Sequence, residues 1–331
     1  MQTPTPLLQI SDLRTSFKIG GGYHAAVDGV DLEIRKNEVF ALVGESGSGK
    51  SALALSITRL HNLNYTKIEG NIAFEGQNLI YMSEKALNKV RGRNIGMIFQ
   101  DPLTALNPLI KVGAQIEESL MYHTNLTKLE RKERAIELLN GVGMVNPALT
   151  YSNLPHELSG GMRQRAMIAL AIACKPDLVI ADEPTTALDV TIQAQILDLL
   201  RKLQAEYQTS ILLITHDLGV VCEMADRVAV MYAGQIVETA NVRDLFKNPQ
   251  HPYTRSLLAS IPSAGEDMHR LHAIKGVVPE LQLLPRTGCR FSHRTPWVPK
   301  HIHEDEPTYH EVGPEHYVLC TCYEKFEFED R

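Results

Sequence analysis

The chain has 331 residues, of which 44% are hydrophobic and 22% are charged. This length and apolar content predict a globular chain with a large core and about two domains. The formal net charge is -6, and the sequence contains no run of Lys or Arg. Dedicated nucleic-acid binders carry a basic patch or stripe, so nucleic acid is not expected as a partner.

The apolar segments are too short to cross a membrane. The longest runs, at residues 166–174 and 211–214, fall far short of the roughly 20 apolar residues that span a bilayer. The N-terminus has neither the positive region nor the apolar region of a secretion signal. We therefore expect a cytosolic chain without a membrane span, whose five cysteines stay mostly reduced.

The N-terminal part alternates turn signals with apolar stretches. Residues 7–10, 30–34 and 39–43 predict strands, and the third strand runs directly into a glycine-rich loop. Residues 51–60 then have helical composition. The order strand, glycine loop and helix is the context of a phosphate-binding site.

This loop, called the phosphate loop below, matches the pattern G-x-x-x-x-G-K-[ST] in full. Its residues are Gly44, Glu45, Ser46, Gly47, Ser48, Gly49, Lys50 and Ser51. The glycines let backbone N–H groups turn toward phosphate oxygens, and the helix presents its positive N-terminus. Lys50 can reach the β- and γ-phosphates of ATP, and the Ser51 hydroxyl can hold Mg²⁺. The alternative is a chance glycine turn, which a second matching element would dismiss.

Residues 102–160 have a helical pattern, clearest at 112–123 and at the amphipathic stretch 128–142. We expect a helical subdomain inserted into a nucleotide-binding fold.

Short buried strands return at residues 178–181 and 211–215, with a helical stretch at 192–207 between them. This alternation predicts a parallel α/β sheet. Beyond about residue 248 the chain becomes rich in proline, histidine and cysteine, which predicts a small C-terminal appendix.

The strand at residues 178–181 ends in two carboxylates, Asp182 and Glu183. Successive strand residues point to opposite sides, so the two can have different tasks at the carboxyl end of the strand. Asp182 suits the Mg²⁺ shell, and Glu183 can polarise the attacking water as a general base. Alone, the pair would favour a solvated acidic strand end; together with the phosphate loop it favours the catalytic interpretation.

A third motif reads Leu-Ser-Gly-Gly-Met-Arg-Gln-Arg over residues 158–165. Ser159, Gly160 and Gly161 precede an apolar stretch and predict a helix N-cap with exposed amides, which suit a phosphate; a plain cap is the alternative. The motif resembles the signature of ABC transporter ATPases. Met162 departs from the glutamine commonest in that signature but is similar to one type of peptide-importer ATPase.

The resemblance implies a dimer with composite sites, because in this family each signature closes over the ATP of the partner cassette. Gln100 resembles the Q-loop residue that contacts metal and water, although a plain loop before a helix is the alternative. Asp189, in Ala-Leu-Asp at 187–189, resembles the D-loop at the dimer interface. His216 resembles the switch histidine that contacts the γ-phosphate; a lone histidine at a strand end is more often structural.

An aromatic residue of the first strands stacks on adenine in this family. Phe17 lies at a family-like distance before Lys50 and is the preferred candidate, ahead of Tyr23, which is nearer to Lys50. Base stacking needs only a π face, so phenylalanine is suitable. Core or turn packing is the alternative for both rings.

The resemblance implies an α/β fold: a P-loop NTPase cassette with a RecA-like core, an antiparallel β subdomain and the helical subdomain at about 102–160. The cassette is expected over residues 5–250, and a C-terminal extension over 251–331.

The extension resembles that of oligopeptide and dipeptide importer ATPases, through Asn-Pro-Gln-His-Pro-Tyr-Thr-Arg-Ser-Leu-Leu at 248–258, Ile-Lys-Gly-Val-Val-Pro at 274–279 and Gly-Cys-Arg-Phe at 288–291. This implies an ATP-hydrolysing subunit on the cytoplasmic face of the membrane. The implied partners are a second, different ATPase, two permeases and, indirectly, an extracellular peptide-binding protein. Nickel or another small solute is the alternative cargo, and a soluble ABC ATPase acting on DNA or ribosomes is the alternative class.

Many relatives of this type carry four cysteines in the extension, which suit an iron–sulfur cluster. Here Cys289 and Cys320 stand at plausible ligand positions, but Thr295 and Ile302 replace the middle pair. Cys322 and a histidine, His301 or His303, could substitute for them. We favour free thiols over a cluster, because the expected ligands are incomplete. Cys174 and Cys222 are expected in the core.

Overall fold

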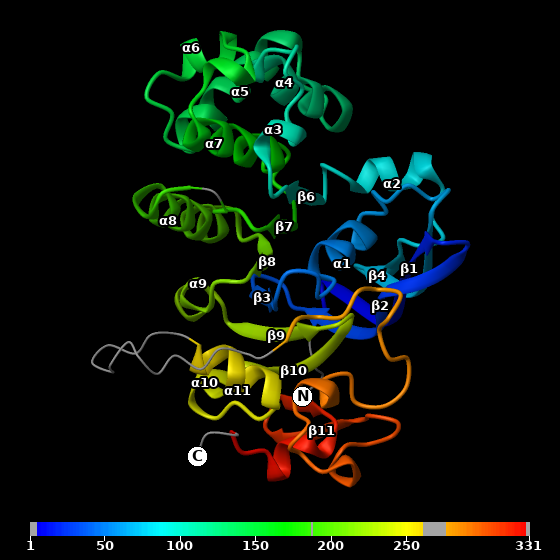
Figure 1. The fold of residues 1–331 in the computed structure, drawn as a ribbon. Helices are drawn as coiled ribbons and strands as arrows, with labels where there is room; N and C mark the ends of the chain where they lie inside the picture. Colours follow the sequence, from blue (N-terminus) through cyan, green and yellow to red (C-terminus); the bar gives the residue numbers. More distant parts are fainter. Residues whose placement is uncertain (1–4, 187, 261–275, 329–331) are drawn as a thin grey trace. The chain divides into compact units, whose positions relative to one another are not determined.

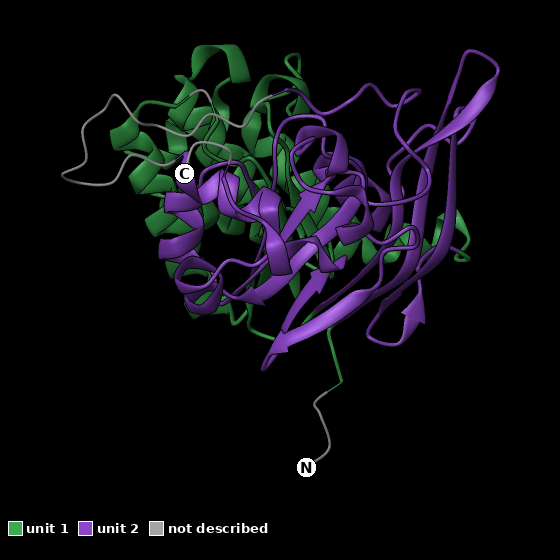
Figure 2. Cartoon of the chain, turned by 60° about the horizontal axis from the view of Figure 1, so that its bottom comes forward, with its two compact units in different colours: residues 1–7, 34–39, 81–214 green, residues 8–33, 40–80, 215–331 purple. Residues whose placement is uncertain are grey.

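The computed structural model describes residues 5–186, 188–260 and 276–328 (Figure 1). Two compact units divide the chain (Figure 2). Unit 1 contains residues 1–7, 34–39 and 81–214, and unit 2 contains residues 8–33, 40–80 and 215–331. Each unit is therefore built from segments that are far apart in the sequence.

Unit 1 contains a parallel sheet and a group of helices. Strands β6 (Ile95–Ile98), β7 (Leu178–Asp182) and β8 (Ser210–Thr215) are parallel, with Ile95 opposite Leu178 and Leu178 opposite Ser210. Every residue of β7 and β8 is buried, as expected for parallel strands covered on both faces. The predicted parallel α/β arrangement is confirmed for these strands.

The helical region predicted at 102–160 is present in unit 1. Its elements are α3 (Pro102–Ala105), α4 (Val112–His123), α5 (Lys128–Gly141), α6 (Pro147–Ser152), η1 (Pro155–Glu157) and α7 (Gly160–Ala171). Thr127 and Glu130 form a capping box that starts α5. The unit also holds α2 (Glu84–Val90) and the long α8 (Val190–Tyr207). Within the described ranges, no helix combines the length and apolar character needed to cross a bilayer.

Unit 2 contains an antiparallel sheet in the order β2-β1-β4-β5. The strands are β1 (Leu8–Ile19), β2 (Gly22–Ile34), β4 (Thr66–Phe74) and β5 (Gln77–Asn78). Strands β1 and β2 extend well beyond the apolar stretches at 7–10 and 30–34. Their additional residues are largely polar or half-exposed, so an apolar run in the sequence marks only the buried end of each strand.

A second set of strands in unit 2 has the order β11-β12-β10-β9-β3. Strand β3 (Val39–Val43) is parallel to β9 (Arg227–Tyr232), and β10 (Gln235–Asn241) is antiparallel to β9. The extension contributes β11 (Tyr309–Gly313) and β12 (His316–Leu319), with Glu238 of β10 opposite Val318. Residues of the C-terminal appendix therefore continue the sheet that carries the phosphate loop.

The remaining elements of unit 2 are short. They are α1 (Lys50–Ile57), α9 (Leu218–Met224), α10 (Val242–Lys247), α11 (Pro252–Ala259), η3 (Ser292–Arg294), η4 (Lys300–Ile302) and η5 (Thr321–Lys325). Residues from β9, α11 and the extension share one apolar core that includes Tyr232, Tyr253, Phe291 and Cys322.

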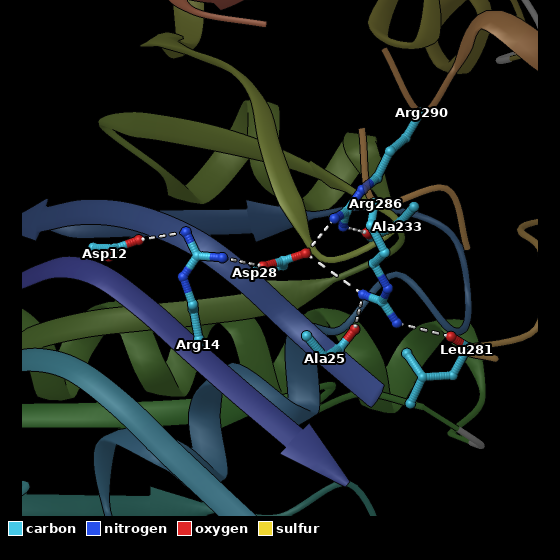
Figure 3. Close-up of polar contacts among 8 residues, drawn as sticks. All are labelled: Asp12, Arg14, Ala25, Asp28, Ala233, Leu281, Arg286 and Arg290. Carbon is cyan, nitrogen blue, oxygen red and sulfur yellow. Dashed lines mark hydrogen bonds and ion pairs between the residues drawn. The ribbon is translucent and has the colours of Figure 1, made fainter. Parts of the chain in front are cut away.

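Asp28 of β2 joins the extension to the antiparallel sheet (Figure 3). Its carboxylate accepts from Arg14 at 2.8 Å, pairs with the buried Arg290, and lies 3.5 Å from Arg286. Arg286 also donates to the carbonyl of Ala25 at 3.0 Å. A buried carboxylate needs such partners, so the contact fixes residues 286–290 onto β2.

Candidate functional site

The phosphate loop leaves the buried strand β3 and enters α1 in the predicted order. Gly49 caps the helix with a φ of 108°, and a Cβ there would lie 2.4 Å from the carbonyl oxygen of Ala26. A Cβ on Gly44 would lie 2.2 Å from the carbonyl oxygen of Met231. Only glycine fits at these two positions, because the neighbouring atoms are backbone.

The Lys50 side chain contacts the start of its own loop. Its side-chain nitrogen donates to the carbonyls of Gly44 at 2.8 Å and Glu45 at 3.0 Å. Ser48 is buried, its hydroxyl has no partner among the described residues, and its carbonyl accepts from Gly234 at 2.8 Å. Ser46, Gly47 and Ser51 are exposed. The loop thus offers a lysine, a hydroxyl and a helix N-terminus, which fit a Mg²⁺-bound triphosphate.

Two residues of the C-terminal part hold Glu45 of the loop. The backbone N–H of Glu45 donates to the hydroxyl of Tyr253 at 2.8 Å. Arg294 donates to both carboxylate oxygens of Glu45, at 3.2 and 3.0 Å, and its side chain is only 2% exposed. Burial raises the pKa of the Tyr253 phenol, which therefore stays neutral and can accept this bond. Sequence reasoning missed both roles, because no local pattern links residues 45, 253 and 294.

In unit 1, the carboxylate of Glu183 lies beside Gln100. Its Oε2 accepts from Nε2 of Gln100 at 2.9 Å and from the hydroxyl of Thr186 at 2.8 Å. Strand β7 ends at Asp182, which is 5% exposed, and Glu183 follows with a φ of 47°. Glu183 therefore lies outside the strand, and the strand alternation that we expected does not extend to it. A left-handed glutamate is strained, and such strain is concentrated at functional sites.

The signature segment caps α7. The Ser159 hydroxyl accepts from the N–H of Met162 at 3.4 Å, so the predicted N-cap is confirmed. Gly160 is exposed, and a Cβ on Gly161 would lie 3.0 Å from Ile192. The buried Gln164 donates to the carbonyl of Pro184 at 2.6 Å, which ties α7 to the residue after Glu183. Sequence reasoning gave Gln164 no role of its own.

Asp189 and His216 both stand at an element boundary and are exposed. Asp189 caps α8 by accepting from the N–H of Ile192 at 3.0 Å. Ala187 of the predicted D-loop lies outside the described residues. His216 follows β8, and Asp217 after it caps α9.

The two aromatic candidates lie on neighbouring strands, Phe17 near the end of β1 and Tyr23 near the start of β2. Phe17 in β1 is half-buried and packs edge-on against His61, with ring centroids 5.2 Å apart. Tyr23 in β2 is 52% exposed. Adenine stacking stays a prediction for both rings.

Three of the five cysteines gather in the extension. The ligand atoms of Cys289, His303, Cys320 and Cys322 all lie within 4.8 Å of one another. His301 is exposed and outside this group, and neither Thr295 nor Ile302 belongs to it.

The expectation for the other two cysteines is wrong at Cys222. That residue is exposed on α9, whereas the buried face of the helix carries Val220, Val221 and Met224. Cys174 is half-buried.

Comparison with known proteins finds two family matches along the chain. A family described as "ABC transporter" matches residues 27–186, and one described as "Oligopeptide/dipeptide transporter, C-terminal region" matches residues 237–299. The second range includes residues 261–275, which lie outside the described part of the chain.

Curated relatives match over nearly the full length. The oligopeptide transport ATP-binding protein OppD of Lactococcus lactis subsp. cremoris (strain SK11) is 48% identical over 98% of this chain and 96% of its own length. OppD of Bacillus subtilis (strain 168) is 52% identical over 95% of this chain and 88% of its own length. Among solved structures, the dimeric cassette MJ0796 in a post-hydrolysis state with ADP and Pi is 29% identical, with a TM-score of 0.64 over 71% of this chain and 99% of that chain.

Proposed function

Because this chain belongs to the ABC transporter ATPases, among the oligopeptide transport ATP-binding proteins, we propose that it hydrolyses ATP to energise a membrane importer of oligopeptides or dipeptides. The observation that carries this proposal is the family match at residues 237–299. A cassette alone does not indicate the cargo, because the ATPase never contacts it. The extension is the part of the chain that is typical of peptide transport.

The phosphate loop binds the triphosphate in this proposal. Its backbone N–H groups and Lys50 contact the phosphates, so the Lys50 ammonium exchanges the carbonyls of Gly44 and Glu45 for phosphate oxygens. From the order of the motifs, Ser51, Asp182 and Gln100 are the residues that would hold Mg²⁺. The ion would supply positive charge to offset the charge that develops during phosphoryl transfer.

Glu183 is proposed as the general base. Its carboxylate accepts from Gln100 and Thr186, and these two hydrogen bonds support the proposal because they restrict the carboxylate that would take a proton from the attacking water. His216 contacts the γ-phosphate, and Phe17 or Tyr23 stacks on the adenine. The support for these roles is the order of the motifs, together with the contacts around Glu183.

The proposed working form is a pair of cassettes on the cytoplasmic face of the membrane. Ser159, Gly160 and Gly161 bind the nucleotide of the partner, and Asp189 lies at the interface. The exposed N-terminus of α7 supports this, because amides there remain available to a phosphate. The partner is a second, different ATPase, and two permeases and a peptide-binding protein complete the importer.

Affinity purification of the full chain from detergent-solubilised membranes tests the assembly. We expect a second cassette and two permeases in the eluate; recovery of soluble partners alone would contradict the proposal.

Growth of a deletion strain on defined peptides tests the cargo. Loss of growth on peptides, restored by the gene, supports peptide import. If the deletion strain grows normally on peptides but no longer takes up nickel, the cargo is nickel and not a peptide. Hydrolysis stimulated by nucleic acid or ribosomes would replace the importer with a soluble ATPase.

A further inference from the structure

The extension gathers a buried set of metal-ligating side chains far from the nucleotide motifs in sequence. We call Cys289, His303, Cys320 and Cys322 the Cys₃His cluster; their ligand atoms all lie within 4.8 Å of one another. Cys320 and Cys322 are 1% and 0% exposed, and Cys289 is 7% exposed. Three thiols and one imidazole are a ligand set that structural zinc sites use.

We propose that the Cys₃His cluster binds one Zn²⁺ ion as a closed structural site. Tetrahedral Zn²⁺ with Zn–S distances of about 2.3 Å places neighbouring ligand atoms about 3.8 Å apart. The mutual distances in the cluster are within 4.8 Å, so small side-chain adjustments bring all four atoms onto one ion. Four protein ligands leave no open position, and the site is therefore structural and not catalytic.

Two hydrogen bonds connect the three segments that carry the ligands. Gly288, before Cys289, donates its N–H to the carbonyl of Asp305 at 2.9 Å. The Thr321 hydroxyl, between the two C-terminal ligands, donates to the carbonyl of Ile302 at 3.1 Å. Each of these hydrogen bonds lies within two residues of the ligands that it connects. The fold itself therefore holds the four ligands close together.

The sulfur atoms also have N–H donors around them. The N–H of Glu304 points at Sγ of Cys320, 3.4 Å away. Nε2 of the buried His251 lies 4.0 Å from Sγ of Cys322. Nδ1 of His251 accepts from the N–H of Tyr253 at 3.1 Å, so Nε2 is the ring nitrogen that carries the proton. Such outer donors orient metal-bound thiolates and are a regular part of metal sites.

His303 supplies an independent observation that points to a ligand. Both of its ring nitrogens are buried, and neither has a hydrogen-bond partner among the described residues. A buried polar atom without a partner costs about 1–3 kcal/mol, so native proteins rarely keep one. A metal ion at the centre of the cluster would accept one of these nitrogens as its ligand.

The same geometry argues against the iron–sulfur cluster that the resemblance suggests. Thr295 and Ile302 stand where that pattern places two cysteines, and neither belongs to the cluster. A cage of several irons holds its thiolates farther apart than one ion does. The replacement ligands, His303 and Cys322, come from other positions and fit a single tetrahedral ion. The ligands present in this chain therefore fit one tetrahedral ion better than the four-cysteine pattern that the resemblance suggests.

The extension also has the character of a segment that needs a metal. Between residues 276 and 308 the described structure consists of turns and the short helices η3 and η4. Short segments of this kind bury little apolar surface, and small folds commonly add a metal or a disulfide for stability. All five cysteines are free thiols here, so a metal is the available means.

Metal analysis of the full chain, purified without a polyhistidine tag, tests the proposal directly. We expect about one zinc per chain by mass spectrometry, with iron and labile sulfide far below stoichiometric after anaerobic purification. Stoichiometric iron with sulfide would overturn the proposal, and so would a chain that contains no metal after growth with zinc. Neither measurement involves ATP, so failure here is distinguishable from failure of the proposed ATPase role.

Paired variants identify the ligands. Cys322→Ser and His303→Ala should each lower the zinc content at least about tenfold under mild chelation. The matched controls are Cys222→Ser, at an exposed thiol, and His301→Ala, at an exposed histidine two residues from His303. Both controls should keep the metal. Equal retention in all four variants would overturn the assignment.

Metal exchange in the unmodified chain tests the site without variants, so the result does not depend on whether a variant folds. Replacing Zn²⁺ with Co²⁺ should give the d–d absorption of a tetrahedral ion and a thiolate-to-cobalt charge-transfer band. Absorption typical of octahedral Co²⁺ without the charge-transfer band would overturn the proposal.

Discussion

The phosphate loop and the Cys₃His cluster lie in the same unit, but they are built in opposite ways. The loop is one stretch of eight residues between a buried strand and a helix, and its glycines fix its shape locally. The cluster takes its ligands from three segments between residues 289 and 322. A contiguous motif carries its own geometry, whereas a dispersed site depends on tertiary packing to bring its ligands together.

Because the phosphate loop and the Cys₃His cluster are built from different segments, we expect that ATP hydrolysis and zinc binding can be lost separately. Glu183→Gln should lower kcat at least about 100-fold, because the amide cannot take a proton from water. ATP binding and zinc content should remain unchanged. Steady-state hydrolysis, nucleotide binding and metal analysis check this, with the exposed Glu206→Gln as the matched control. Preserved hydrolysis in Glu183→Gln would remove the residue from its proposed role.

The second test breaks the loop locally. Gly49→Ala places a Cβ 2.4 Å from the carbonyl oxygen of Ala26 at a φ of 108°. Overpacking together with the left-handed φ should cost about 2–3 kcal/mol and weaken ATP binding about 30- to 160-fold. Gly47→Ala is the control, since its φ is 80° but no atom lies within 4 Å of its Cβ. Titration with a fluorescent ATP analogue measures both. If both variants lose the same ATP affinity, the positive φ and not the close contact with Ala26 is the reason that glycine is needed at position 49.

The third test concerns Arg294, a residue of the extension that contacts Glu45 of the phosphate loop. Arg294→Ala removes the ion pair with Glu45 from a position where the side chain is 2% exposed. We expect a loss of about 2 kcal/mol of stability, because the partner carboxylate is left partly buried and unpaired. The midpoint of thermal unfolding should fall by about 3 °C. Arg243→Ala, at an exposed arginine, should leave it unchanged. A double variant with Glu45→Gln should recover part of the loss if the pair is its cause.

The smallest expected effect concerns the cap of α7. Ser159→Ala removes the acceptor for the N–H of Met162 and should cost about 1 kcal/mol, whereas Ser159→Asn should restore most of it. Thermal unfolding of the isolated chain measures this loss of stability. A loss of several kcal/mol would mean that Ser159 has a further structural partner.

Locally encoded features were predictable from the sequence. The phosphate loop, the helices at 112–123 and 128–141, and the buried strands β7 and β8 follow from glycine chemistry, periodicity and apolar runs. The outer parts of β1 and β2 were missed, because half-exposed strand residues give no apolar signal.

Long-range features were beyond sequence reasoning. Tyr253 and Arg294 reach Glu45 from more than 200 residues away. Glu183 leaves the strand pattern because its backbone turns, which residue type alone does not indicate. For the Cys₃His cluster, the sequence suggested Cys322 and either His301 or His303 as substitute ligands, and only the packing shows that His303 is the histidine beside the three thiols.

The pairing of β12 with β10 has a consequence for any shortened form of this protein. A chain cut at residue 250 loses β12, and the N–H and C=O groups of β10 that pair with it become an open sheet edge. Open edges invite pairing with other chains and aggregation. In the full chain the edge position passes to β11, a strand of five half-exposed or exposed residues that is too short to recruit another chain easily. A chain without the extension is therefore expected to aggregate more readily than the full chain, because it would expose the edge of β10.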